Sequence, residues 1–128
     1  MSILKVTDIQ SNGTGFNDVV SFKNASGTEN GTLCRAWVNF DGQGTVAIRA
    51  DFNVSSITDN GTGDYTLNFT NVMPDANYCL VGTAGNGNTN NRFVSQVRSV
   101  AVGSLRIGTI DGANSVIDPG FVFIAIFR

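Results

Sequence analysis

The sequence predicts an all-β fold: an antiparallel β-sandwich of jelly-roll-like type, with about eight strands in residues 33–128 and an extended arm in residues 1–32. Three observations predict this fold. Apolar and polar residues alternate with a period of two along most of the chain. Short alternating runs are separated by Gly, Asn and Asp turns, and no segment carries the apolar stripe of a helix. With 128 residues, the chain is expected to bury a single core.

The first 32 residues show little of this alternation. Their apolar residues are sparse, and residues 11–15 and 24–31, which are rich in Asn, Gly, Ser and Thr, are interpreted as linkers. We therefore expect an extended arm that can lie along a neighbouring protein. Its candidate contact residues are Ile3, Val6 and Ile9.

The first predicted strand, residues 33–40, alternates between its two faces. The residues expected to point into the core are Cys34, Ala36, Val38 and Phe40. Trp37 lies with Arg35 and Asn39 on the opposite, polar side. Since Trp is enriched where a ring meets a second surface, Trp37 indicates contact with a loop or with another subunit.

Four more strands and three turns follow. The predicted strands are residues 46–48, 52–57, 65–70 and 78–83, and the predicted turns are residues 41–44, 59–64 and 73–77. In the second turn, the Asn60-Gly61 pair tolerates positive φ, which favours a hairpin. In the third, Pro74 cannot donate to a central strand ladder.

Residues 84–92 are dominated by Asn and Gly and predict an exposed, mobile loop. Asparagine amides are suited to hydrogen bonding with sugars, so this loop is a candidate recognition surface. Its candidate residues are Asn86, Asn88, Asn90 and Asn91.

Three strands complete the predicted sandwich, at residues 93–102, 105–110 and 121–127. The last strand is apolar on both faces, which a sheet with one solvated face does not require. Either the first thirty residues or identical neighbouring subunits could cover the second face. The candidate subunit contacts are Trp37, Phe121, Phe123 and Phe127.

Composition argues against nucleic-acid and membrane partners. The formal charge is −2, and the eight basic residues are scattered, so no cluster can neutralise a run of phosphates. No stretch approaches the ~20 apolar residues needed to span a bilayer. Residues 1–5 lack the apolar region of a signal peptide, and we expect synthesis in a host cytoplasm.

The two cysteines, Cys34 and Cys79, both lie in alternating apolar runs. Reduced core thiols are the expectation for a cytosolic product. Whether the two residues pair is left open.

The residue types that carry most enzymatic chemistry are missing or isolated. Histidine is absent, and the acidic residues occur singly in turns, where Asp side chains close their own backbone turns. A paired-carboxylate glycosidase and a calcium loop at residues 59–64 are the alternatives, but the first needs a larger cleft and the second lacks a downstream Glu. We predict a non-enzymatic protein with no catalytic residue, no metal site and no cofactor.

The middle of the chain resembles a module of tail-fibre-like and other small accessory virion proteins of marine and freshwater phages, including phages of cyanobacteria. The resemblance is carried by residues 35–42, 44–49, 53–65 and 73–78, and residues 4–10 resemble the N-terminal segment of such proteins. It implies a structural role on a virion and brings no catalytic residues. Residues 84–128 are outside it.

Two functional hypotheses follow from the fold and the resemblance. The first is a capsid decoration, or cement, protein: a homotrimer made in the host cytoplasm that binds the major capsid protein or another virion protein. The alternative is a short tail-fibre or fibre-head protein that binds a host surface glycan or receptor. The absence of a shaft repeat or heptad pattern favours the first, because a fibre needs a shaft.

Overall fold

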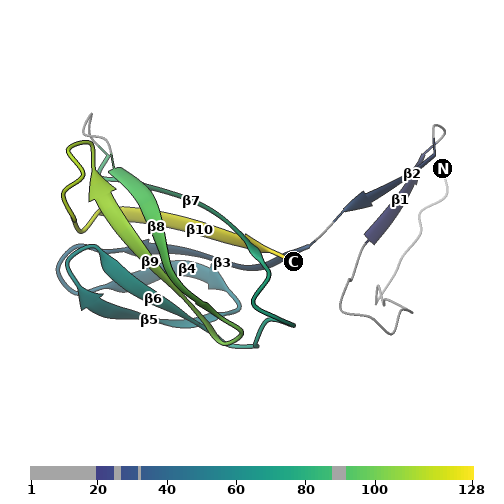
Figure 1. The fold of residues 1–128 in the computed structure, drawn as a ribbon, viewed down its shortest axis with the longest axis horizontal. Coiled ribbons are helices and arrows are strands. Elements are labelled where there is room, and N and C mark those ends of the chain that lie inside the picture. Colours follow the sequence, from purple (N-terminus) through teal and green to yellow (C-terminus); the bar gives the residue numbers. More distant parts are fainter. Residues whose placement is uncertain (1–19, 25–26, 32, 88–91) are drawn as a thin grey trace. The chain divides into compact units, whose positions relative to one another are not determined.

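The computed structural model describes residues 20–24, 27–31, 33–87 and 92–128, and these residues form β-strands and turns (Figure 1). The chain divides into two compact units, Met1–Leu33 and Cys34–Arg128. No helix among the described residues is long and apolar enough to cross a membrane.

In the first unit, β1 (Val20–Asn24) and β2 (Gly27–Gly31) form an antiparallel hairpin with Val20 opposite Gly31. The interpretation of residues 24–31 as a linker was therefore wrong for residues 27–31, because backbone pairing orders a segment that lacks apolar alternation. Residues 1–19 lie outside the described residues, and with them Ile3, Val6 and Ile9. The extended arm over residues 1–32 stays a prediction.

The second unit is an all-β sandwich whose described strand pairs are all antiparallel, which confirms the predicted fold class. Its eight strands match the eight predicted runs: β3 (Cys34–Asp41), β4 (Ala47–Phe52), β5 (Val54–Gly61), β6 (Asp64–Phe69), β7 (Cys79–Gly85), β8 (Arg92–Ala101), β9 (Ser104–Asp111) and β10 (Phe121–Phe127). They hydrogen-bond in the order β4-β3-β10-β7-β8-β9-β6-β5.

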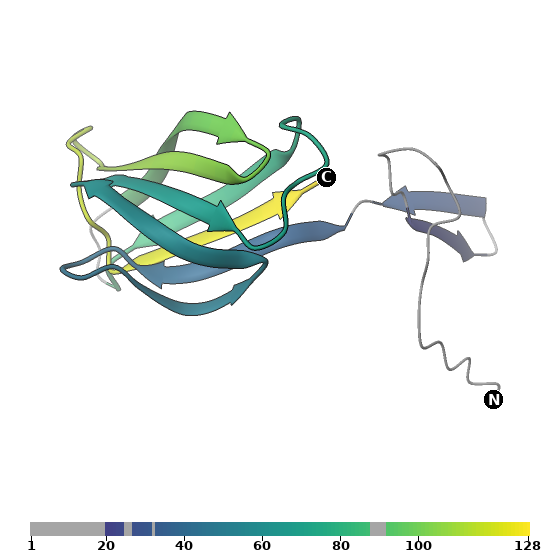
Figure 2. The ribbon, with the colours of Figure 1, turned by 90° about the horizontal axis from the view of Figure 1, so that it is seen from below.

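This single ladder folds into two layers (Figures 1 and 2). The first layer is β4-β3-β10-β7 and the second is β8-β9-β6-β5. Between the layers, the pairing of β7 with β8 among the described residues is limited to Ala84 opposite Arg92. The order β10-β7-β8-β9 is a Greek key, the unit from which jelly rolls are built.

The corner between β4 and β5 brings the two ends of the strand order together. Asn53 takes a left-handed backbone conformation there, with φ of 58°. Its side chain donates to the Arg35 and Asn71 carbonyl oxygens and accepts from the Asn71 N–H. Asn tolerates this backbone conformation better than most residues, and its side-chain hydrogen bonds stabilise the corner.

The core lies between the layers and is supplied by alternate residues of the strands. The fully buried members are Ala36, Val38, Phe40, Tyr65, Leu67, Leu105, Ile107, Val122 and Ile126. The rings of Phe40 and Tyr65 meet edge to face across the layers, with centroids 5.2 Å apart. Period-two alternation thus sends one side of β3, β6 and β10 inward, as predicted.

The β5–β6 turn differs in detail from the prediction. Positive φ occurs at Gly61 and Gly63, while Asn60 stays in the strand and donates through Nδ2 to Thr66 Oγ1 at 2.8 Å.

Cys34 is half-buried, Cys79 is exposed, and both are free thiols. The expectation that Cys79 is a core thiol was wrong, because its position in β7 points outward.

Candidate binding surface

The two outer surfaces of the sandwich differ in chemistry. On the β4-β3-β10-β7 layer, large apolar side chains point to solvent, and we call this surface the aromatic face. Its members and their exposed fractions are Trp37 (40%), Phe52 (54%), Val81 (59%), Phe121 (38%) and Phe123 (42%). Exposed apolar patches of this kind on a soluble domain mark interaction sites.

Strand register assembles the aromatic face from four separate strands. Trp37 of β3 lies opposite Phe52 of β4 on one side and Ala125 of β10 on the other. Ala125 in turn lies opposite Val81 of β7. Residues directly opposite in an antiparallel ladder share a face, so Phe52, Trp37, Ala125 and Val81 form one row across the layer.

Phe121, Phe123 and Arg49 form a second cluster, at the other end of the aromatic face. Phe121 and Phe123 are stacked, with centroids 6.2 Å apart and planes 9° from parallel. The Arg49 guanidinium lies over the Phe121 ring, 4.6 Å from its centroid, and Arg49 Nη2 contacts Asp41 Oδ2 at 2.7 Å. The ion pair positions the Arg49 guanidinium for its cation–π contact with the Phe121 ring.

A shallow, open groove of about 460 Å³ runs across the middle of the aromatic face. Its lining is Trp37, Val38, Asn39, Ala50, Val81, Gly82, Thr83, Phe123, Ile124 and Ala125, without a charged residue. Asn39 and Thr83 supply the polar side chains, and Asn39 Oδ1 is buried without a hydrogen-bond partner among the described residues. Ring faces with few polar groups suit an uncharged ligand that has both C–H faces and hydroxyls.

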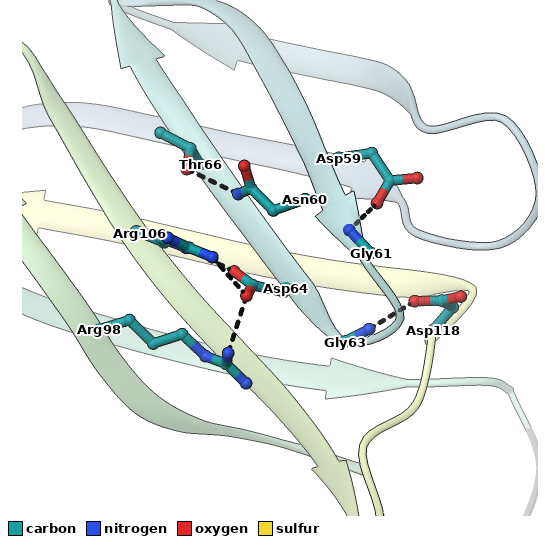
Figure 3. Close-up of polar contacts among 9 residues, drawn as sticks. All are labelled: Asp59, Asn60, Gly61, Gly63, Asp64, Thr66, Arg98, Arg106 and Asp118. Atoms are coloured by element: carbon teal, nitrogen blue, oxygen red, sulfur yellow. Dashed lines mark hydrogen bonds and ion pairs between the residues drawn. The ribbon is translucent and has the colours of Figure 1, made fainter.

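The outer surface of the other layer is polar and internally hydrogen-bonded (Figure 3). Arg106 holds both oxygens of Asp64 through two bonds of 2.8 Å, and Arg98 Nη1 donates to Asp64 Oδ2 at 2.7 Å. The Arg106 hydrogen bond is the main reason that the pKa of Asp64 lies below its ordinary value. Asn68 Nδ2 donates to Ser56 and Thr58 on β5. We call this surface the polar face.

The Asp118 carboxylate bridges the β5–β6 turn and the Tyr65 hydroxyl at the end of the sandwich. Asp118 Oδ1 accepts the Gly63 N–H at 2.7 Å and the Tyr65 hydroxyl at 2.6 Å. The same hydroxyl lies 3.1 Å from the Gly42 carbonyl oxygen. Burial, and secondly the hydrogen bond to Asp118, raise the pKa of Tyr65 far above its ordinary value of 10.

We expect Tyr65→Phe to lower the free energy of unfolding by about 1–2 kcal/mol at neutral pH, because a buried hydrogen bond is lost. In the wild type, the unfolded Tyr65 ionises near pH 10 and the folded one at higher pH, so stability falls as pH rises above 10. Urea unfolding from pH 7 to 11 should show a shallower alkaline decline for the variant. Tyr78→Phe is the comparison: burial also raises the pKa of Tyr78, but less than that of Tyr65, so this variant should change the alkaline decline less. An unchanged decline in Tyr65→Phe would contradict this assignment.

Two further acidic side chains form ion pairs with arginines of the same sandwich. Asp41 pairs with Arg49, and Asp75 pairs with Arg128 at 2.6 Å, which lowers the pKa of Asp75. Among the described residues, no group of three or more His, Cys, Asp or Glu side chains could hold a metal ion. The non-enzymatic interpretation stays a prediction.

The structure gathers only some of the predicted site residues. Trp37, Phe121 and Phe123 meet on the aromatic face, whereas Phe127 is half-buried at the end of β10. Asn86 is half-buried, and its Oδ1 accepts the Gly120 N–H at 2.6 Å, so it serves the fold. Asn88, Asn90 and Asn91 lie outside the described residues.

Sequence reasoning missed three members of the surface: Phe52, Val81 and Arg49. Each belongs to a predicted strand or lies beside one, but only the register places them next to Trp37, Phe121 and Phe123. Phe52 and Val81 occupy positions in their predicted strands whose side chains alternate away from the core, and this alternation could have identified both residues.

No protein-family model matches the sequence. No curated protein sequence matches it either. Among solved structures, the fold is similar to that of the phiAB6 tailspike, which was determined in complex with three-repeated oligosaccharides of Acinetobacter baumannii surface polysaccharide. The TM-score is 0.51 at 16% identity, and the likeness covers 85% of this chain and 23% of the tailspike chain. The similarity is one of fold, over less than a quarter of the tailspike.

Proposed function

We propose that this chain is a phage virion protein of the tail-fibre or tailspike kind, which binds a surface polysaccharide of the host through its aromatic face. The observation that carries the proposal is the uncharged groove between Trp37 and Phe123, which is open to solvent and lined by ring faces, Asn39 and Thr83. Two further arguments support it: the fold shared with a tailspike that binds a bacterial surface polysaccharide, and the resemblance of residues 35–78 to phage tail-fibre-like modules.

The chemistry of the groove fits a carbohydrate. A pyranose ring carries C–H groups on its faces and hydroxyls around its edge, so it gains from packing on an aromatic ring and from hydrogen bonds in the same contact. Trp37 and Phe123 offer the rings, and the exposed Thr83 offers a hydroxyl. Asn39 also lines the groove, although its Oδ1 is buried. A shallow groove that is open along its length admits a polymer at any internal repeat, where a closed pocket would admit only an end.

We expect Trp37→Ala to weaken binding to host polysaccharide at least tenfold, because loss of one stacked ring removes about 1.5 kcal/mol or more of contact energy. Phe123→Ala should act similarly. The measurement is calorimetry or biolayer interferometry on purified chain with polysaccharide extracted from the host, together with retention on host cells. Since Trp37 and Phe123 point outward from the sandwich, both variants should keep the wild-type circular dichroism spectrum.

Two controls sharpen the experiment. Thr58→Ala changes the polar face and should leave polysaccharide binding unchanged, whereas Trp37→Phe keeps a ring and should retain part of it. Loss of binding in Thr58→Ala, or wild-type binding in both Trp37→Ala and Phe123→Ala, would contradict the proposed site.

The capsid decoration hypothesis is the second candidate. What favours it is the exposed apolar area of the aromatic face, since such surfaces also occur at protein interfaces. Saturable binding of the chain to tail-free heads of the same phage, at a fixed ratio per shell, would support decoration; retention on host cells without binding to heads would support the polysaccharide function.

A further inference from the structure

Strand β7 has an open edge. On one side it pairs with β10 along its whole length, from Phe121 opposite Gly85 to Phe127 opposite Cys79. On the other side, the pairing among the described residues is limited to Ala84 opposite Arg92 of β8. Figures 1 and 2 show that β8 diverges from β7 towards the start of β7. In an antiparallel strand every second residue directs its N–H and C=O away from the paired neighbour, and among the described residues those of 79–83 that face away from β10 have no strand partner.

This edge also lacks the features that keep natural edge strands from pairing. Cys79–Gly85 contains no charged residue and no proline, and Val81 and Thr83 are exposed. The opposite edge strand of the layer, β4, carries Arg49 and Asp51 and leads directly into the corner with β5. Since soluble proteins usually protect an edge with charge, proline or a cover, an unprotected edge is a site for strand addition.

We propose that a second copy of this chain pairs with β7 of the first, antiparallel and about a two-fold axis at Val81. The absence of charge on β7 argues for a second copy as the partner. A two-fold axis brings each residue near the same residue of the other copy, so any charge on β7 would be repelled by its counterpart, and β7 carries none. In this register Val81 lies opposite the partner's Val81, and Cys79 lies opposite the partner's Thr83. The backbone groups of residues 79–83 that face away from β10 gain hydrogen-bond partners on both strands.

The pairing joins the aromatic faces of the two copies. Directly opposite residues of an antiparallel pair point to the same side of the sheet. The first layers of both copies would thus form one continuous layer, with the aromatic faces on the same side. Because Val81 and Thr83 line the groove, the grooves of the two copies would meet at the two-fold axis. This inference does not depend on polysaccharide binding, since it rests on the edge of β7.

The test uses a pair of charge variants at the axis. In Val81→Asp and in Val81→Lys, like charges would face each other across the axis, whereas a mixture of the two sets opposite charges together. By sedimentation equilibrium, we expect wild type at twice the 13.5 kDa chain mass. Each variant alone should dissociate with a dimer dissociation constant at least tenfold higher, and an equimolar mixture should return to the wild-type mass.

Controls separate edge pairing from misfolding and from association elsewhere. Val81 is exposed, so both variants should keep the wild-type circular dichroism spectrum. Val116→Asp, a change at a similarly exposed valine (52%) outside the named strands, should leave the dimer intact. A wild-type monomer at millimolar concentration, a trimer, or variants that alone associate like wild type would overturn the proposal.

Discussion

Gly63→Ala is expected to lower the free energy of unfolding by about 3 kcal/mol or more, because it combines backbone strain with a steric clash. Gly63 has φ of +65°, a conformation that costs an L-residue about 1–2 kcal/mol. A Cβ atom there would lie 2.6 Å from the Thr109 carbonyl oxygen and 2.9 Å from the Ile117 nitrogen. Both contacts are to backbone, so neither neighbour can rotate away, and the turn would have to move.

The chain offers a matched control for this prediction. Gly44 has nearly the same φ, +61°, but a Cβ atom there would meet nothing within 4 Å. Gly44→Ala should therefore cost only the conformational strain, about 1 kcal/mol. Urea unfolding followed by tryptophan fluorescence measures both variants. Equal losses in the two would show that the contacts of Gly63 with Thr109 and Ile117 contribute nothing.

The clash at Gly63 also shows what sequence patterns can and cannot predict. The alternation of Tyr65, Leu67 and Phe69 is local, and it predicted β6 and its buried side correctly. The contact of Gly63 with Thr109 and Ile117 joins segments more than forty residues apart, and no local pattern encodes it. For the same reason the strands were predictable, whereas their order in the ladder was not.

The residues of the candidate site were likewise predictable where a local pattern marks them, and not where only the strand register brings them together. That Trp37 and the outer side of β10 place apolar residues away from the core was predictable, because they break the alternation of polar and apolar residues. Phe52, Val81 and Arg49 join them only through the register of four strands. The structural contact of Asn86 was not predictable, because Asn-rich composition is common to recognition loops and to turns, and its bond to Gly120 could not be read from composition.

The contrast between the two outer surfaces supports the proposal that a ligand binds to the aromatic face. On the polar face, Asn60, Asn68 and Asp64 are satisfied by bonds within the sandwich, so binding there would first have to break them. On the aromatic face, the rings of Trp37 and Phe123 are exposed, and covering them removes apolar surface from water, at about 25 cal/mol per Å².

Asp64→Asn is expected to lower the free energy of unfolding by about 2 kcal/mol, because three charge-assisted hydrogen bonds lose their anion. The Asp64 side chain is 10% exposed and joins β6 to Arg106 of β9 and Arg98 of β8, so the loss falls on the centre of the second layer. The Asn side chain keeps the volume but has a single, uncharged acceptor oxygen in place of two.

The same substitution should change how stability depends on pH. The Arg106 hydrogen bond holds the pKa of folded Asp64 below its ordinary value of 3.8. The unfolded state therefore binds a proton first, and the stability that Asp64 contributes is present above pH 3.8 and lost as pH falls through the lower folded pKa. Thermal unfolding between pH 2.5 and 7 should show a smaller acid decline in Asp64→Asn than in wild type. Asp75→Asn, which breaks the more exposed pair with Arg128, is the matched control and should cost less at neutral pH. If Asp75→Asn costs as much as Asp64→Asn, the two arginines around Asp64 add nothing beyond an ordinary surface pair.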